Sequence, residues 1–295
     1  MISVLIPTYN YNAFSLVSIL HKQLENEKVA FEIICLDDGS KKFHSENQNI
    51  NNLTNASYTI LEKNIGRSAI RNLLAKKATF ENLLFLDSDT IPVNKNFIAT
   101  YLSEIDTDEK AVYGGVKYQE AKPSKELVFR WIYGKTRESL SAEERKKNQY
   151  LCFLTNCFLI KKSVFEQIKF DENLKNWGHE DTLFSYNLQQ KKIKILHIEN
   201  PVFHEGLENT ATFLSKTEEA LKGLIYLTEN GLIDPNYVKL SKSYDWLQKY
   251  GLIGFYKLFF KAIKNFSLKQ FESKNPSLFL FDLYRLGLFC NLKSK

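Results

Sequence analysis

Two aspartates spaced one residue apart, Asp87 and Asp89, follow the apolar run 83–86, which predicts a buried strand. In open α/β sheets, ligands bind beyond the carboxyl ends of the strands, so we expect both carboxylates where a ligand would lie. Two hard oxygen ligands of this kind suit Mn²⁺ or Mg²⁺ carrying a diphosphate. By itself the segment is also typical of a solvated turn.

Two further acidic pairs, Asp37-Asp38 and Glu180-Asp181, follow other predicted strands or turns. Such ends converge on one rim of a doubly wound sheet. Carboxylates gathered there repel one another unless a cation or a positive ligand lies between them. Asp38 could accept an imino N–H of uracil or guanine, and residues 7–9 could form the wall of a base site; the alternative is an ordinary turn.

Basic residues accompany these acids. Arg67 and Arg71 lie four apart at the start of a predicted helix, hence on one face. A helix N-terminus beside arginine is a diphosphate site, and solvent-exposed arginines are the alternative. His204 follows the last predicted strand; a lone histidine is usually a surface or core residue, but with Asp87 and Asp89 it becomes a third candidate metal ligand.

The pentapeptide 177–181, Trp-Gly-His-Glu-Asp, has the composition of an acceptor site. Gly178 would let a backbone approach a ligand closely, and Trp177 offers a face for a sugar ring. A neighbouring carboxylate can take the proton of an attacking hydroxyl. The alternative, acidic residues favoured at a helix N-terminus, is compatible with this role because the acids open a helix.

Strands and helices alternate, which predicts βαβ units, a parallel sheet and an α/β fold. We expect strands at residues 2–6, 31–36, 58–61, 83–86, 111–116, 151–160 and 193–198. Residues 201–206 are predicted as a loop, and the charged segment 119–149 as a mobile lid or an exposed helix. The chain beyond 212 is helical in pattern and aromatic. The sequence thus predicts domains at 1–211 and 212–295.

The C-terminal region carries a second possibility. Residues 250–266 place aromatic residues on one helical face beside lysines, which suits a helix packed on the main domain or a basic amphipathic surface for an anionic membrane. Charged residues interrupt the apolar run 278–288, so it is not a predicted span.

The bulk composition is ordinary for a globular protein. The chain has 295 residues, of which 44% are hydrophobic, and a net charge of +6 that favours anionic ligands but is too small to indicate nucleic acid binding. The four cysteines lack CxxC spacing, and we find no signal peptide. We therefore expect a cytoplasmic protein, peripheral at most to the inner face of the cell membrane.

Five motifs together resemble family 2 glycosyltransferases in order and spacing over about residues 1–210. They are Ile-Pro-Thr-Tyr-Asn at 6–10, Asp-Asp-Gly-Ser at 37–40, Asn-Ile-Gly at 64–66 with Arg-Asn at 71–72, Leu-Asp-Ser-Asp at 86–89 and Gly-His-Glu-Asp at 178–181. The resemblance implies a GT-A fold, here followed by a mainly helical C-terminal extension. It also implies transfer of a sugar from a nucleotide-diphosphate donor, with a UDP-sugar favoured, to a hydroxyl of a glycan or lipid-linked glycan, as in polysaccharide biosynthesis.

The same resemblance implies residue roles. The nucleotide or donor residues would be Pro7, Thr8, Tyr9, Asp37, Asp38, Arg67, Arg71 and Ser88. Asp87 and Asp89 match the DxD motif that binds the metal, Mn²⁺ or Mg²⁺. Asp181 matches the base of an inverting transfer, with Glu180 contacting acceptor or base.

Trp177 and Gly178 resemble the acceptor-side motif of polypeptide N-acetylgalactosaminyltransferases and chondroitin-type polymerases, in which a downstream histidine completes the metal site; this supports His204. The Gln-x-x-Arg-Trp motif of processive synthases is missing, since Leu127 stands where Gln would precede Arg130. The alternatives are a catalytically silent sugar-nucleotide-binding or membrane-associated scaffold and a sugar-1-phosphate nucleotidyltransferase. The latter would need a Gly-rich basic loop after the first strand, which residues 7–10 do not provide.

Overall fold

The computed structural model describes residues 1–174 and 178–293, which form two compact units. The first comprises Met1–Tyr118, Glu138–Asn173 and Phe184–Gly206, and the second Gln119–Arg137, Leu174–Leu183 and Leu207–Lys295. The predicted domain division between residues 211 and 212 remains a prediction, because units defined by contacts need not be continuous along the chain.

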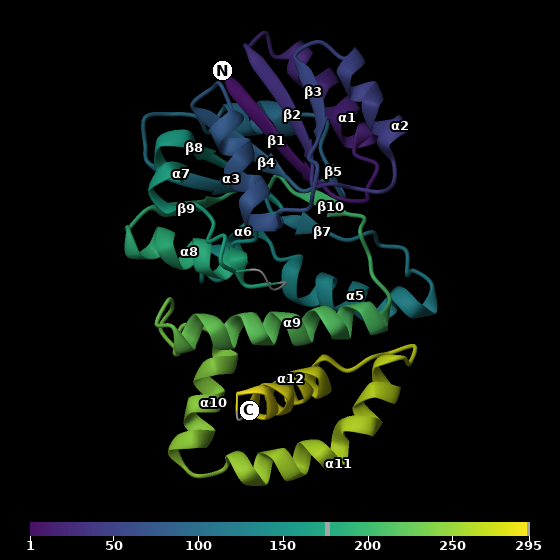
Figure 1. Cartoon of the computed structure of the whole chain (residues 1–295), viewed down its shortest axis with the longest axis vertical. Coiled ribbons are helices and arrows are strands. Elements are labelled where there is room, and N and C mark those ends of the chain that lie inside the picture. Colours follow the sequence, from purple (N-terminus) through teal and green to yellow (C-terminus); the bar gives the residue numbers. More distant parts are fainter. Residues whose placement is uncertain (175–177, 294–295) are drawn as a thin grey trace. The chain divides into compact units, whose positions relative to one another are not determined.

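The first unit is built on a seven-stranded sheet of order β3-β2-β1-β4-β8-β6-β9 (Figure 1). The strands are β1 (Ile2–Thr8), β2 (Phe31–Asp37), β3 (Ala56–Ile60), β4 (Asn82–Leu86), β6 (Lys110–Tyr113), β8 (Cys157–Lys161) and β9 (Lys194–His197). The expected parallel sheet needs one correction: β8 runs antiparallel to both β4 and β6. The sequence does not reveal this, because a buried strand of either direction is an apolar run.

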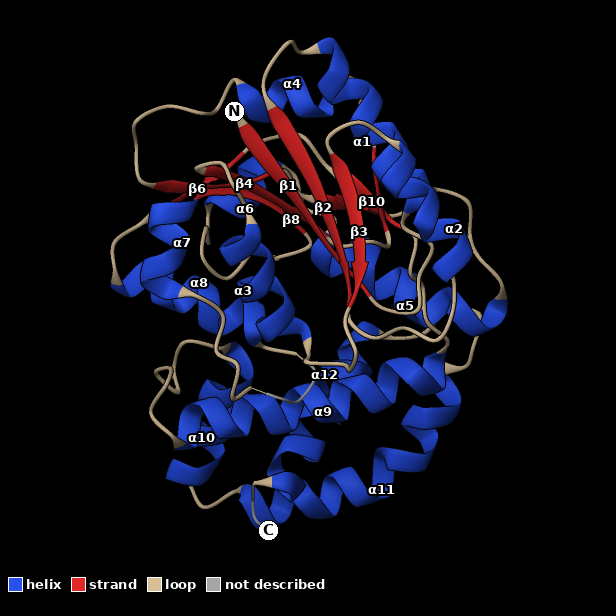
Figure 2. Ribbon diagram, turned by 45° about the horizontal axis from the view of Figure 1, so that its top comes forward, coloured by secondary structure: helices blue, strands red, loops and turns tan. Residues whose placement is uncertain are grey.

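Helices cover both faces of this sheet (Figure 2). Along β1, Ile2, Val4 and Ile6 face a core that includes α1 (Phe14–Asn26) and α4 (Phe97–Leu102). Leu5 faces the opposite core, as the two-residue period of a strand requires. That core includes α3 (Arg67–Lys77), α7 (Lys162–Ile168) and the part of α8 (Glu180–Gln190) that begins at Phe184.

A second, three-stranded sheet of order β5-β10-β7 is formed by segments that the sequence predicts only partly. Its strands are β5 (Thr90–Pro92), β7 (Val116–Lys117) and β10 (Val202–His204). The expected loop at 201–206 is therefore wrong in part, because a three-residue strand leaves too short a pattern to detect. In the β5–β10 pair, His204 lies opposite Thr90. Because Thr90 follows the loop after β4, the histidine lies beside that loop.

Short helices fill the remaining connections. These are α2 (His44–Gln48) with a 3₁₀ turn (Asn49–Asn52), a 3₁₀ turn (Lys125–Leu127), α5 (Val128–Tyr133), a π turn (Gly134–Glu138) and α6 (Ala142–Lys146). The segment 119–149, predicted as a lid or one exposed helix, thus contains several short helices. A capping box between Ser141 and Glu144 fixes the start of α6.

The second unit is helical, as predicted for the C-terminal region. Its long helices are α9 (Thr210–Glu229), α10 (Lys239–Lys249), α11 (Ile253–Phe271) and α12 (Leu278–Leu292) (Figure 1). Aromatic packing holds them together: the ring of Phe129 in α5 stacks on Phe271 at 4.7 Å and meets Phe281 edge-on at 5.0 Å. No helix in the described parts of the chain has the length and apolar content to cross a bilayer.

Candidate functional site

Asp37 is a buried residue that stabilises the loop after β2 through hydrogen bonds. It is completely buried; its Oδ1 accepts the Ser40 amide at 2.7 Å and its Oδ2 accepts the Tyr58 hydroxyl at 2.5 Å. Burial, reinforced by Asp37, raises the pKa of Tyr58, so this phenol remains a donor. The supporting role predicted for Asp37 fits this geometry and remains a prediction.

Asp38 joins the loop after β2 to the start of α3. Its two carboxylate oxygens accept the backbone amides of Ile65 at 2.7 Å and Gly66 at 3.0 Å, and only 5% of the residue is exposed. Burial raises the pKa of Asp38, while the two amide bonds act in the opposite direction. The backbone amide of Asp38 also donates to the carbonyl of Thr8 at 2.9 Å, so the ends of β1 and β2 and the N-terminus of α3 meet at this carboxylate.

The last residue of β1 and the residue that follows it differ sharply in exposure. Thr8 is buried, whereas 52% of Tyr9 is exposed beside the junction that Asp38 makes. The next residue, Asn10, donates its amide to the Ser40 hydroxyl at 2.6 Å, which fixes this loop against the one after β2. Tyr9 therefore offers an exposed aromatic ring at the carboxyl end of the sheet, where the sequence predicts a base site.

Two arginines of α3 hold Asp87. Arg71, with 2% of its side chain exposed, places Nη2 2.5 Å from Asp87 Oδ1, and Arg67, 37% exposed, lies 3.5 Å from Oδ2. The Nε of Arg71 is buried and has no hydrogen-bond partner among the described residues. Arg67, Arg71 and Asp87 thus lie together, and the contacts of this carboxylate are with the two arginines.

Asp89 turns instead toward β10. Its Oδ2 lies 3.5 Å from Nε2 of His204, and its carbonyl accepts the amide of Glu205 at 2.8 Å. A Cβ on Gly206 would collide with the Asp89 carboxylate, so a larger residue there would force this carboxylate to move. Burial, followed by the charges of Asp89 and Glu205, raises the pKa of Tyr11, which places a third polar group at the same corner.

Two of these side chains, Asp89 and His204, suit a divalent metal ion. Within residues 1–174 and 178–293, no three His, Cys, Asp or Glu side chains gather around one point. Asp89 and His204 nevertheless provide an oxygen and a nitrogen aimed at each other. Metals that carry a diphosphate are commonly bound through one or two protein ligands and completed by phosphate oxygens and water. Asp89 and His204 would hold such a metal; the metal role predicted for Asp87 remains a prediction.

The predicted catalytic and acceptor-binding residues lie in the second unit, apart from Trp177, which is outside the described residues. Gly178 has φ +91°, and a Cβ there would lie 2.6 Å from the Cβ of Ala220 in α9. Glu180 and Asp181 open α8, and Asp181 Oδ1 accepts the Thr182 amide at 2.7 Å. The 178–181 turn is therefore packed on α9, with its two acids at a helix N-terminus.

Three further residues of the corner around Asp89 were not predicted. Tyr11, Glu205 and Gly206 lie within two residues of Tyr9 or His204, so their positions in the sequence offered a signal. The tight approach of Gly206 to Asp89 depends on the β5–β10 pairing, which only the structure shows. Ser88, predicted to bind the donor, lies partly exposed between the two aspartates.

Comparison with one solved structure supports the fold. A mannosyltransferase from Pyrobaculum calidifontis, PcManGT, bound to GDP-Man and Mn²⁺, superposes with a TM-score of 0.57 at 12% identity, covering 99% of this chain and 86% of its own. S. aureus TarS in complex with UDP-GlcNAc has a TM-score of 0.48 at 20% identity, covering 76% and 66%. The predicted fold class, a GT-A α/β fold with a helical C-terminal region, is confirmed.

Sequence comparison finds relatives and a family. Chondroitin synthase of Escherichia coli is 28% identical, covering 70% of this chain and 35% of its own, and an uncharacterised glycosyltransferase of Rickettsia felis is 26% identical, covering 81% and 38%. The chain therefore spans little more than a third of the length of these relatives. The family model described as glycosyl transferase family 2 matches residues 3–169, more than half of the chain. The protein is a member of glycosyl transferase family 2.

Proposed function

We propose that this protein is an inverting, metal-dependent transferase that moves a hexosyl or N-acetylhexosaminyl group from a UDP-sugar to an acceptor hydroxyl. The observation that carries the proposal is the arrangement at the end of β4, where Arg71 holds Asp87 while Asp89 faces His204. Positive and metal-ligating groups lie side by side there, as a nucleoside diphosphate with its metal requires.

In this proposal the donor lies along the ends of β1, β2 and β4. The exposed ring of Tyr9 stacks on the base, while Pro7, Thr8 and Asp38 shape the pocket that receives base and ribose. Arg67 and Arg71, at the N-terminus of α3, attract the diphosphate and meet the negative charge that develops as it leaves. When bound, Mn²⁺ or Mg²⁺ supplies Lewis-acid neutralisation of the departing diphosphate.

Asp181 acts as the general base. Its carboxylate takes the proton of the acceptor hydroxyl, whose oxygen attacks the anomeric carbon from the face opposite the diphosphate. The new C–O bond forms as the bond to the diphosphate breaks, so the configuration inverts. Glu180 contacts the acceptor, and Trp177 and Gly178 line its site. The close packing of Gly178 against Ala220 fixes the turn that leads into Glu180 and Asp181.

A glycan or a lipid-linked glycan is the proposed acceptor, in polysaccharide biosynthesis at the inner face of the cell membrane. The E. coli relative named for chondroitin synthesis supports a glycan acceptor, and the GDP-Man and Mn²⁺ of the mannosyltransferase support a nucleotide-sugar donor with a divalent metal.

The test is transfer itself. The protein is incubated with Mn²⁺, an α-linked UDP-sugar and a panel of glycan and lipid-linked acceptors, and the product's anomeric configuration is read by nuclear magnetic resonance. A β-linked product, formed only with metal, is expected. An α-linked product would overturn the inverting mechanism, and undiminished transfer in chelator would overturn the metal dependence.

A further inference from the structure

One face of α11 is apolar although it points to solvent. Phe255, Leu258, Phe259 and Phe266 follow the spacing of a single helical face, and they are 72%, 69%, 37% and 65% exposed. The helix also has a buried side, formed by Phe260, Ser267 and Phe271, which packs with α12. One apolar side is therefore covered by protein, and the other has no covering among the described residues.

The exposed apolar surface continues from α11 into α10. Trp246 and Tyr250 are 55% and 58% exposed, their rings lie 5.0 Å apart, and Leu252 in the connection is 36% exposed. We call these residues together with the four of α11 the α10–α11 face. Seven large apolar side chains clustered on two packed helices exceed the single exposed residues that are normal on a soluble surface, and such patches mark interaction sites.

The charge of the same two helices is strongly one-sided. Residues 239–271 contain seven lysines and one aspartate, a net +6 that equals the net charge of the whole chain. Six of these lysines are exposed. Lys242 and Lys249 lie four and three residues from Trp246, and Lys269 lies three residues from Phe266, so these exposed lysines lie beside the apolar residues. An apolar face bordered by lysines is typical of a helix that lies in a membrane interface.

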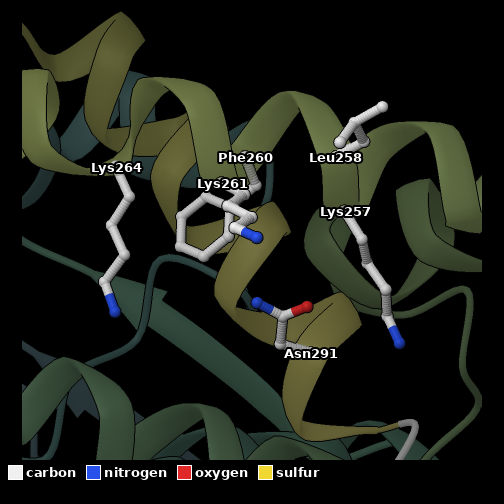
Figure 3. Close-up of a pocket in the computed structure, with 6 residues that line it drawn as sticks. All are labelled: Lys257, Leu258, Phe260, Lys261, Lys264 and Asn291. Atoms are coloured by element: carbon white, nitrogen blue, oxygen red, sulfur yellow. The ribbon is translucent and has the colours of Figure 1, made fainter.

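Three of the lysines surround a hollow between α11 and the end of α12 (Figure 3). Lys257, Lys261 and Lys264 line a space of about 420 Å³ together with Asn291, and their amino groups lie on the same side of α11 as the Asn291 amide. None of the three lysines has an ion-pair or hydrogen-bond partner in the described parts of the chain. Their charge is available to an outside anion on the α12 side of α11, whereas Leu258 of the α10–α11 face points to the opposite side of the helix (Figure 3).

We infer that the α10–α11 face docks on an anionic lipid bilayer. The aromatic and leucine side chains enter the boundary between headgroups and acyl chains, where amphipathic rings are favoured. Lys242, Lys249 and Lys269 remain at headgroup depth and bind lipid phosphates, with their apolar stems along the same boundary. The helices lie on the bilayer and do not cross it, in agreement with their length and composition.

A second copy of the chain is a poorer occupant. A two-fold interface would place the face against itself, and therefore the lysines of one copy against those of the other. Residues 239–271 offer only Asp245 as an opposing charge. Like charges across an interface oppose association, whereas an anionic bilayer complements Lys242, Lys249 and Lys269 at once.

Vesicle sedimentation tests the inference without donor or acceptor, so its outcome is independent of the proposed transfer. The full chain is mixed with vesicles of phosphatidylcholine alone or with added phosphatidylglycerol, at low and high salt. We expect binding to the anionic vesicles that weakens with salt. Lys242→Gln/Lys249→Gln/Lys269→Gln should weaken binding by about 100-fold, at roughly fivefold per lysine.

A second variant tests how much the aromatic side chains contribute to vesicle binding. Phe255→Ser/Phe266→Ser should reduce vesicle binding by at least about tenfold for each ring removed from the bilayer. Matched controls on the first unit are Lys22→Gln/Lys76→Gln/Lys191→Gln and Leu151→Ser, all at exposed positions. The controls should bind as the unaltered protein does. All these side chains face solvent, so circular dichroism should show the fold retained.

Three results would overturn the inference. Equal binding to neutral and anionic vesicles would remove the role of the lysines. Binding unchanged in both variants would place the contact elsewhere. Self-association in light scattering that Phe255→Ser/Phe266→Ser abolishes, with no vesicle binding, would assign the face to a second copy.

Discussion

Arg71 lies 2.5 Å from Asp87 with 2% of its side chain exposed, and this pair joins α3 to the end of β4. The arginine charge is therefore fixed in place before any ligand arrives. In a site of this kind a preoriented cation costs little reorganisation when negative charge develops. The pair thus links the stability of the first unit to the proposed donor site.

Replacing Arg71 should impair both properties. Arg71→Met leaves the largely buried carboxylate of Asp87 without its closest partner, so thermal unfolding should show a loss of about 3 kcal/mol. Arg67→Met is the matched control, because Arg67 is 37% exposed and 3.5 Å from Asp87, and should cost less than about 1 kcal/mol. Equal losses for the two variants would contradict the importance of the buried pair.

Asp89→Asn should weaken metal-dependent donor binding while leaving the fold intact. The substitution removes the charged oxygen that faces His204 and keeps the side-chain size. Isothermal titration of the nucleotide in Mn²⁺ and in chelator measures the effect. Asp108→Asn, at an exposed position outside the site, is the control. The same affinity for Asp89→Asn and the unaltered protein in Mn²⁺ would remove Asp89 as a ligand.

Asp181→Asn should abolish transfer and preserve donor binding. Loss of a general base lowers the rate by about 10²–10⁴-fold, and none of the residues proposed to bind the donor is changed. Initial rates and nucleotide affinity are measured on the same preparation. Substantial residual transfer would exclude Asp181 as the base.

The turn before Asp181 should not tolerate a side chain at Gly178. Gly178→Ala combines a strained φ of +91° with a Cβ 2.6 Å from Ala220, so the turn must shift and transfer should fall. Gly231→Ala is a close control, since Gly231 has φ +65° and open space around it. It should cost about 1 kcal/mol of stability and no transfer activity. Full activity of Gly178→Ala would show that the turn does not position the reaction.

Buried His197 should make the protein less stable in acid. Its Nδ1 accepts from Arg145 at 3.2 Å and its Nε2 lies 2.9 Å from the carbonyl of Gln149, so the ring is held neutral. Burial, with Arg145 and Lys146 beside it, lowers the pKa of His197 from 6.5 to about 4. The unfolded chain therefore binds the proton more readily, and the stabilisation present above pH 6.5 is lost as the pH falls toward 4.

The size of this effect is about 3 kcal/mol at most. Chemical denaturation at a series of pH values measures it, and His197→Gln should flatten the dependence in that window. An unchanged slope for His197→Gln would assign the acid sensitivity to other groups.

Much of this site follows from the sequence because its parts are local. Three features can be recognised without a structure: acidic residues at strand ends, a glycine before a helix, and arginines four residues apart. The structure brings some of these residues into contact, as Arg71 with Asp87 and Asp89 with His204. The antiparallel direction of β8 and the three residues of β10 depend on pairing between distant segments, which leaves no local pattern. The close approaches of Gly206 and Gly178 are likewise visible only once their neighbours are in place.

Thermal unfolding of the whole protein with UDP, GDP or CDP, each in Mn²⁺, Mg²⁺ or chelator, tests the central claim most directly. A ligand that binds only the folded state must stabilise it. We predict a rise in Tm with UDP that requires the divalent metal and disappears in Asp89→Asn. No rise with any nucleotide, or an equal rise in chelator, would contradict a metal-dependent donor site at Asp89 and His204.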